Sequence, residues 1–271
     1  MLPLSPQVFA ILSGLVGERA GLHFDHTCRA TFADKVGARA VELGFDSLLD
    51  YYYFLRYDPH GPGELDALIE DLVVHETYLF RELPPLETMV SNLIVPAIEA
   101  GRRPRIWCAA CATGEEPHTV AILLAARGLL DQVDLVASDI SASALERARS
   151  GRFHGRALRQ SLPPFAGPWL DVDERGVTAQ ARLTQSIDWR RINLLDRAAV
   201  AALGTFDIVL CRNVLIYFND QTAHRVIDGI ATVLRPGAAL FVGVSESLLR
   251  LRTTLICEEK QGVFLYKRPS I

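Results

Sequence analysis

The chain has 271 residues, 49% of them hydrophobic and 22% charged, a composition typical of a globular protein with one large or two modest domains. Its formal net charge of −4 argues against nucleic acid as the main partner, because proteins that bind nucleic acid usually present a basic field. The sequence contains no run of about eighteen apolar residues, so it predicts no membrane-spanning helix.

The N-terminus and the cysteines indicate a protein of the reducing cytosol. The N-terminus lacks a basic segment, and Pro3 and Pro6 precede a short amphipathic stretch, so we expect a helix there and not a secretion signal. The five cysteines are odd in number and scattered, as is typical of reduced thiols and not of a disulfide framework. We therefore expect a cytoplasmic location.

Residues 1–80 are predicted to form a helical domain. Apolar residues recur at helical spacing near residues 8–15, 36–43 and 65–72. The stretch DPHGPGE, Asp58 to Glu64, is a chain-breaking loop that leads into the last of these helices.

From Pro104 onward the sequence predicts an α/β fold. Short apolar runs alternate with helical patterns, a sign of parallel strands joined by crossover helices in a doubly wound, Rossmann-like sheet. The runs lie at 106–112, 135–138, 206–211 and 239–244, and the helices lie at 117–127, 142–149 and 221–234. We assign residues 81–271 to this domain, with an antiparallel hairpin at its C-terminal edge.

One segment interrupts the alternation. Residues 153–188 are rich in proline, glycine and alternating polar and apolar positions. A loop of this length without secondary structure is uncommon in a compact domain. We therefore predict a small antiparallel β-subdomain inserted into the sheet domain.

The first strand ends in a C-x-x-C pair, Cys108 and Cys111, within WCAACATGEEP. A structural zinc needs four ligands, and the sequence has no second C-x-x-C or H-x-x-x-H. A redox pair would open a helix, whereas Cys108 lies in the strand pattern and Pro117 marks the helix start several residues later. We favour buried packing for both thiols and expect no metal.

The residues after this strand favour a ligand site. Small residues up to Gly114 let a ligand approach the backbone, and the following helix can direct free N–H groups at it. The glycines do not form G-x-G-x-x-G, and Glu115 and Glu116 would repel a pyrophosphate. A cationic ligand such as S-adenosylmethionine (SAM) suits these acids, although they could also merely cap the helix.

Two further strand ends carry polar residues. Asp139 ends the second strand, where a doubly wound fold places an acid on ribose hydroxyls. Arg212 and Asn213 follow the strand FDIVLC, and Tyr217 lies shortly after them. Because parallel strands end at one edge of the sheet, these side chains are expected to line one crevice.

The motifs together resemble the CheR family, the chemotaxis receptor methyltransferases. VVHETYLFRE, WCAACATGEEP, ASDISASALERARSG, INLLD, FDIVLCRNVLIYF and LRPGAALFVGVSESL occur in the order typical of that family. The resemblance runs from about residue 8 to the C-terminus. It implies SAM-dependent O-methylation of receptor glutamates, which yields methyl esters and S-adenosylhomocysteine.

The resemblance also implies roles for individual residues. Glu116, with Glu115 beside it, is expected to hold the methionyl ammonium of SAM, and Asp139 its ribose. Asn193 and Leu194 are expected to contact the adenine.

Further cofactor contacts are expected from His75, Thr77, Arg81, Arg212 and Asn213. The resemblance implies that Arg81 and Tyr217 are the catalytic residues, which would orient the substrate glutamate. A glutamate side chain is already a carboxylate at neutral pH, so no general base is required.

The resemblance implies the cytoplasmic helical bundle of a chemoreceptor as partner, and we expect a monomer. Arg29, Lys35 and Arg39 either form a solvated face or dock onto this acidic bundle. The insertion has only Gly176 in LDVDERGVTA, so we do not expect it to bind a receptor C-terminal pentapeptide. The sequence leaves two alternatives open: a SAM-dependent carboxyl methyltransferase with another acceptor, or a non-enzymatic SAM sensor.

Overall fold

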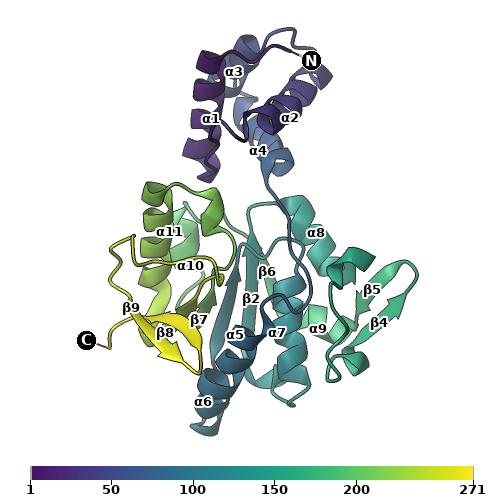
Figure 1. Ribbon diagram of the computed structural model, residues 1–271, viewed down its shortest axis with the longest axis vertical. Coiled ribbons are helices and arrows are strands. Elements are labelled where there is room, and N and C mark those ends of the chain that lie inside the picture. The colour runs from purple at the N-terminus through teal and green to yellow at the C-terminus, as the bar shows by residue number, and fades with distance from the viewer. Residues whose placement is uncertain (1, 271) are drawn as a thin grey trace. The chain divides into compact units, whose positions relative to one another are not determined.

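A computed structural model describes residues 2–270 (Figure 1). The chain divides into two compact units. The helical unit contains the residues up to Val74 together with Tyr217–Thr222, and the sheet unit contains His75–Ile216 and the residues from Ala223 onward.

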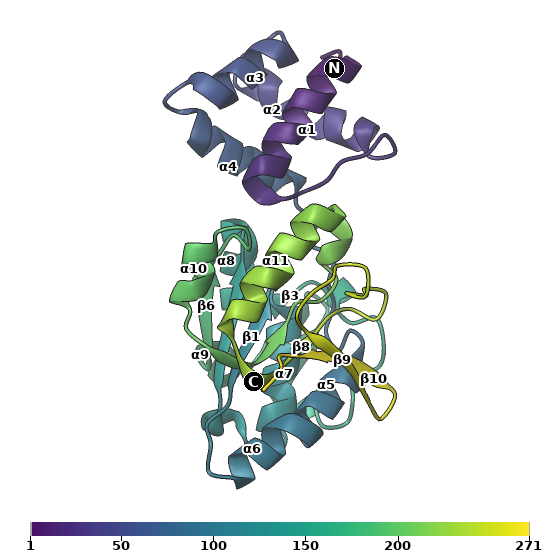
Figure 2. The ribbon, with the colours of Figure 1, turned by 90° about the vertical axis from the view of Figure 1, so that its left-hand side faces the viewer.

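The helical unit is built from four helices that pack on one another (Figure 2). They are α1 (Pro6–Ala20), α2 (Arg29–Glu42), α3 (Leu48–Tyr57) and α4 (Gly61–Leu72). Ser5 caps α1 by accepting a hydrogen bond from the Val8 N–H, and a left-handed Gly21 ends the helix. The segment at Tyr217 adds to this unit, because the His23 N–H donates to the Tyr217 carbonyl at 2.8 Å.

A polar network inside the helical unit ties α2, α3 and α4 together. Arg39 donates to both carboxylate oxygens of Glu64, at 2.5 and 2.9 Å, and Tyr51 donates to Glu64 at 2.6 Å. Burial raises the pKa of Tyr51, so its hydroxyl keeps its proton and stays a donor. Arg39 also pairs with Asp71, and Lys35 donates to the Asp71 carbonyl. Arg39 and Lys35 therefore hold the helices together, and neither is a free cation of a solvated face.

The sheet unit is a seven-stranded mixed sheet in the order β6-β2-β1-β7-β8-β10-β9. Its strands are β1 (Arg105–Ala109), β2 (Asp134–Asp139), β6 (Ile187–Arg191), β7 (Phe206–Leu210), β8 (Leu234–Phe241), β9 (Ile256–Lys260) and β10 (Val263–Lys267). The first five are parallel, and β10 pairs antiparallel with β8 and β9. The expected edge hairpin is confirmed.

Helices cover both faces of this sheet. Figure 1 shows α7 (Glu115–Ala125) and α8 (Ala142–Ser150) on one side, and α10 (Arg197–Ala202) and α11 (Asp220–Val233) on the other. Such double coverage explains why β1 is buried along almost its whole length and reads as an uninterrupted apolar run.

The remaining helices of this unit are short. They are α5 (Leu83–Met89), a π-helical turn (Val90–Ile94), α6 (Val95–Glu99) and α9 (Ala181–Gln185). The α5–α6 segment was not among the predicted helices, and α5 packs on β10. Ser141 caps α8 by accepting the Ala144 N–H, and a left-handed Gly151 ends the helix.

The insertion is a separate three-stranded antiparallel sheet in the order β3-β5-β4. It consists of β3 (Arg152–Phe153), β4 (Leu170–Asp173) and β5 (Gly176–Ala179). Gly176 has φ 145°, and a Cβ there would lie 2.2 Å from the Phe153 carbonyl oxygen, so this turn requires glycine. The predicted fold class is confirmed: an α/β Rossmann-like domain with a helical N-terminal domain and an inserted β-subdomain.

Within residues 2–270 no helix combines the length and the apolar character needed to cross a membrane.

The Arg39 network predicts an unequal response to two arginine substitutions. Arg39→Ala should lower the free energy of unfolding by about 1–3 kcal/mol, because the largely buried Glu64 loses its guanidinium partner. Arg56→Ala, which breaks an exposed pair with Glu18, should cost much less, because water already screens that pair. Urea denaturation of both variants measures the difference, and equal losses would contradict a structural role for Arg39.

Candidate functional site

The predicted site residues of the sheet unit come from strands whose carboxyl ends lie at one edge of the sheet. The chain runs outward from β1 to β2 and β6, then returns to β7 on the other side of β1 and continues to β8. The strand order therefore reverses between β1 and β7. In open α/β sheets the ligand crevice lies at such a reversal.

The turn after β1 is strained and held in place by its neighbours. Ala110 and Ala112 have φ values of 55° and 47°, in the left-handed region that non-glycine residues rarely occupy. The Cys111 N–H donates to the Ser138 carbonyl, and the Ala112 N–H donates to the Asp139 carboxylate at 2.8 Å. Strain of this kind is typical of functional turns.

Gly114 ends this turn and begins α7. Its φ is 92°, and a Cβ would lie 2.6 Å from the Ala148 Cβ and 3.2 Å from the Trp189 ring. The buried His118 accompanies it, with Nδ1 bonded to the Gly114 carbonyl at 2.7 Å and Nε2 to the Thr184 hydroxyl. Burial lowers the pKa of His118 to about 4, so the ring is neutral at physiological pH.

Two acids open α7, as expected, but their surroundings differ. Glu115 is buried and accepts the Thr113 hydroxyl at 2.7 Å. Glu116 accepts Arg212 Nη1 at 2.7 Å. Burial raises the pKa of both carboxyls, and for Glu116 burial outweighs the attraction of Arg212.

Arg212 is the buried centre of a charged cluster in the sheet unit. Its Nη2 donates to the Glu82 carboxylate at 2.8 Å and to the Arg81 carbonyl at 3.1 Å, while Nη1 binds Glu116. Its Nε has no hydrogen-bond partner among residues 2–270. One buried guanidinium thus faces two carboxylates, and the partly exposed Arg81 lies at the edge of this cluster, with its Nε 4.0 Å from Glu82 Oε1. Paired carboxylates of this kind suit a cationic group such as the ammonium of SAM.

Asp139 lies beside the loop after β6. Its two carboxylate oxygens accept the N–H groups of Ala112 and Ser141, and the Ile192 N–H donates to its carbonyl at 2.9 Å. The Asn193 side chain accepts the Leu195 N–H, and Leu194 is buried. The structure therefore places the loop that carries Asn193 and Leu194 next to Asp139.

The segment from His75 to Glu82 contributes Arg81. Arg81 Nη1 donates to the Glu76 carbonyl at 2.9 Å, and its guanidinium lies over the Tyr78 ring at 5.6 Å. The Arg81 side chain keeps 24% of its surface exposed, in contrast to the buried Arg212. His75 and Thr77 lie half-buried in the same segment.

Tyr217, unlike the other predicted site residues, lies outside the sheet unit. It ends a short 3-10 turn, Leu215–Tyr217, and by its contacts it belongs to the helical unit.

The C-x-x-C pair is buried, as expected. Cys108 lies in β1 and Cys111 in the strained turn, and burial raises the pKa of both thiols well above the ordinary value. Thiols of this kind are poor nucleophiles and metal ligands. Among residues 2–270, no cluster of histidine, cysteine and acidic residues is suited to holding a metal ion.

Sequence reasoning missed three polar residues of this region. Glu82 accepts Arg212, the Asn213 side chain and the Val244 N–H; Glu246 accepts three backbone N–H groups; and His118 holds Gly114. The signal available in the sequence was the acid in each of the stretches FRE and SES. Those letters do not reveal partners elsewhere in the chain.

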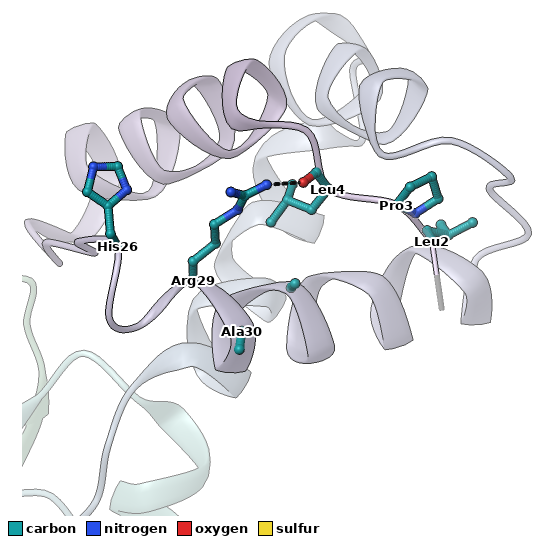
Figure 3. Close-up of a pocket in the computed structure, with 7 residues that line it drawn as sticks. Leu2, Pro3, Leu4, His26, Arg29 and Ala30 are labelled. Atoms are coloured by element: carbon teal, nitrogen blue, oxygen red, sulfur yellow. Dashed lines mark hydrogen bonds between the residues drawn. The ribbon is translucent and has the colours of Figure 1, made fainter.

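A separate hollow lies in the helical unit (Figure 3). It has a volume of about 500 Å³ and is lined by Leu2, Pro3, Leu4, His26, Arg29, Ala30 and Ala33. Arg29 donates to the Leu4 carbonyl at 2.5 Å. Its lining is mostly apolar, and it lacks the paired carboxylates that distinguish the crevice of the sheet unit.

The sheet order, the strained turn after β1 and the carboxylates around Arg212 fit a SAM-dependent methyltransferase. The family model for the SAM-binding domain of CheR methyltransferases matches residues 75–263, and that for their all-alpha domain matches residues 7–73. The chain belongs to the CheR methyltransferase family, and SAM is its methyl donor.

Named relatives agree with this assignment. The chain is 33% identical over 241 residues to chemotaxis protein methyltransferase 2 of Vibrio cholerae, covering 86% of this chain and 83% of that protein. It is 34% identical over 239 residues to the probable biofilm formation methyltransferase WspC of Pseudomonas aeruginosa, covering 87% of this chain and 56% of that protein.

A solved structure with a weaker likeness is the N-methyltransferase NodS of Bradyrhizobium japonicum in complex with S-adenosylhomocysteine. Its sequence is 14% identical, the TM-score is 0.42, and the match covers 87% of this chain and 98% of that one.

The geometry of Gly114 predicts a loss of SAM affinity in Gly114→Ala. The added Cβ must displace Ala148 or Trp189, so we expect the dissociation constant for SAM to rise about 10-fold. Gly128→Ala is the matched control, since Gly128 also has positive φ but no atom within 4 Å of the added Cβ. Calorimetric titration with SAM measures both variants, and equal affinities would contradict the role of Gly114.

The raised pKa of Glu116 predicts weaker SAM binding in acid. Because this carboxyl takes up a proton at a higher pH than an ordinary glutamate, it should lose its attraction for the SAM ammonium earlier on acidification than an exposed glutamate would. Affinity should therefore decrease as the pH is lowered in the wild type, whereas Glu116→Gln should bind weakly at all pH values with a flatter profile. A profile unchanged by the substitution would assign the titration to another group.

Proposed function

We propose that the protein transfers the methyl group of SAM to glutamate side chains on the cytoplasmic helical bundle of a chemoreceptor. Membership of the CheR family and the likeness to a protein named as a chemotaxis methyltransferase support this acceptor. The observation that carries the proposal is the pair of carboxylates, Glu82 and Glu116, that meet at the buried Arg212 and suit a cationic methyl donor.

The proposed chemistry needs orientation more than proton transfer. SAM supplies a methyl group on a sulfonium, and a substrate glutamate is already a carboxylate at neutral pH. The neutral His118, with both ring nitrogens hydrogen-bonded, suits a mechanism without a general base. Alignment and exclusion of water would then provide most of the acceleration.

We assign the cofactor contacts as the sequence indicated them. Glu116 would bind the ammonium, with Glu115 beside it; Asp139 would bind the ribose; and Asn193 with Leu194 would contact the adenine. His75, Thr77, Arg212 and Asn213 would complete the cofactor site.

Arg81 and Tyr217 are proposed to orient the substrate carboxylate. The partly exposed guanidinium of Arg81 supports its role, because Arg81 still has donors to offer where Arg212 is enclosed by protein partners. A glutamate carboxylate accepts such donors in a fixed geometry.

A second acceptor is favoured by one observation. The likeness to the probable biofilm formation methyltransferase WspC covers 87% of this chain, as much as the likeness to the chemotaxis relatives. A carboxyl methylation with a sensor outside chemotaxis as acceptor is therefore the alternative. We propose a monomeric enzyme in either case.

The β4–β5 connection bears on how an acceptor is held. Asp173 accepts the N–H groups of Arg175 and Gly176 and closes a tight turn. We infer that this turn does not bind a receptor C-terminal pentapeptide, because it has neither the length nor the glycines of a docking loop.

The test uses methyl-labelled SAM and membranes that contain candidate receptors, followed by base treatment. Methyl esters release volatile methanol in base, so we expect volatile label that follows a receptor-sized band. A receptor without its last five residues should be methylated at the same rate. Label that is stable in base, or confined to a non-receptor protein, would exclude the proposed acceptor.

Variants in the same assay separate turnover from binding. Tyr217→Phe should lower kcat by about 10–100-fold with little change in SAM affinity, because only the orienting hydroxyl is lost. Tyr57→Phe, at a side chain that is 71% exposed, is the matched control. A Tyr217→Phe enzyme with full kcat would exclude Tyr217 from the reaction.

A further inference from the structure

Glu246 occupies an unusual position just beyond β8. Its carboxylate accepts three backbone N–H groups: Asn213 and Gly243 donate to Oε2 at 2.7 Å each, and Leu215 donates to Oε1 at 2.8 Å. The side chain thus joins the loop after β7 to the loop after β8. A carboxylate that accepts three such bonds fixes the position of the backbone that donates them.

The backbone that Glu246 holds is strained. Asn213 has φ 59°, a left-handed conformation that is sustained only where neighbouring groups enforce it. Gly243 lies so close that a Cβ there would be 2.5 Å from Asn213 Nδ2 and 2.9 Å from Glu246 Oε2. The Glu246 N–H also donates to the Gly243 carbonyl, which closes the turn at 2.8 Å.

Glu246 holds the backbone of Asn213, which is assigned to SAM together with its neighbour Arg212. Asn213 Nδ2 donates to Glu82 Oε1 at 3.2 Å, and Glu82 Oε2 accepts both Arg212 and the Val244 N–H. Glu82 therefore fixes the side chains of the Arg212–Asn213 pair, whereas Glu246 fixes the backbone that carries them. A second carboxylate that reaches only backbone donors is well suited to positioning.

We propose that Glu246 is a positioning residue for SAM, which acts through the left-handed backbone of Asn213 and does not itself touch the cofactor. This inference rests on the proposed placement of Arg212 and Asn213 at the cofactor. It assigns the SES stretch a role in cofactor affinity, separate from the chemical step.

The main variant is Glu246→Gln in the full-length protein. The substitution preserves size but replaces one acceptor oxygen with an NH₂ group, which then faces a backbone N–H. We expect the dissociation constant and the KM for SAM to rise about 10-fold, with kcat at saturating SAM within about twofold of wild type. Glu259→Gln, an exposed position on β9 of the same sheet, is the matched control and should change none of these.

A double-mutant cycle with Asn213→Ala separates positioning from a general effect on folding. If Glu246 acts through Asn213, Glu246→Gln should add little to the loss of SAM affinity that Asn213→Ala causes alone. Independent structural damage would make the two losses additive. Glu246→Asp, which keeps the charge but shortens the reach, provides a milder variant should the glutamine protein fail to fold, and its SAM affinity should also fall.

The outcomes distinguish this inference from the proposed function. Additive losses, or a SAM affinity of Glu246→Gln and Glu246→Asp equal to that of the Glu259→Gln control, would overturn the role of Glu246 alone. Unchanged SAM affinity in Asn213→Ala would overturn the placement of the cofactor on which the role depends.

Discussion

The arrangement of Glu82 and Glu116 depends on one buried guanidinium. Arg212 carries its charge into the interior beside β7, where an unpaired charge would be prohibitive, and two glutamates from distant parts of the chain compensate it. Glu116 comes from the first helix after β1, and Glu82 from the segment that leads into the sheet unit. Since both acids converge on one cation, removing the cation would leave the partly buried Glu82 and Glu116 carboxylates without their shared partner and in mutual repulsion.

Positive φ values gather around this charge cluster. Ala110, Ala112 and Gly114 follow β1, Glu82 precedes α5, and Asn213 follows β7. For the non-glycine residues this conformation costs free energy, and the backbone N–H groups of Ala112 and Asn213 are held by the Asp139 and Glu246 carboxylates. The acids of the site thus do two things at once: they set its charge, and they hold a backbone that would otherwise relax.

The sequence predicted the parts of this site that follow from strand ends. Glu116 and Arg212 each follow an apolar run, so the rule that parallel strands end at one edge was enough to anticipate that they lie close together. The hydrogen bond from the Val244 N–H to Glu82 joins residues 162 positions apart, and no local sequence pattern predicts it. Arg39 is a second example. Its spacing along the helix suggested a cation on an exposed face, but in the structure it is paired with Glu64 of another helix.

The inserted β-subdomain is connected by direct contacts to the turn that follows β1. One ring nitrogen of His118 is hydrogen-bonded to the Gly114 carbonyl, and the other is hydrogen-bonded to Thr184, which follows the strands of the insertion. The His118 ring also packs edge-on against Phe153 of β3. The Leu79 N–H, near Arg81, donates to the Ala157 carbonyl on the other side of the insertion. The subdomain is therefore built into the catalytic unit at both ends. If the subdomain were exchanged between relatives to alter acceptor choice, His118 and Thr184 would have to be exchanged together with it.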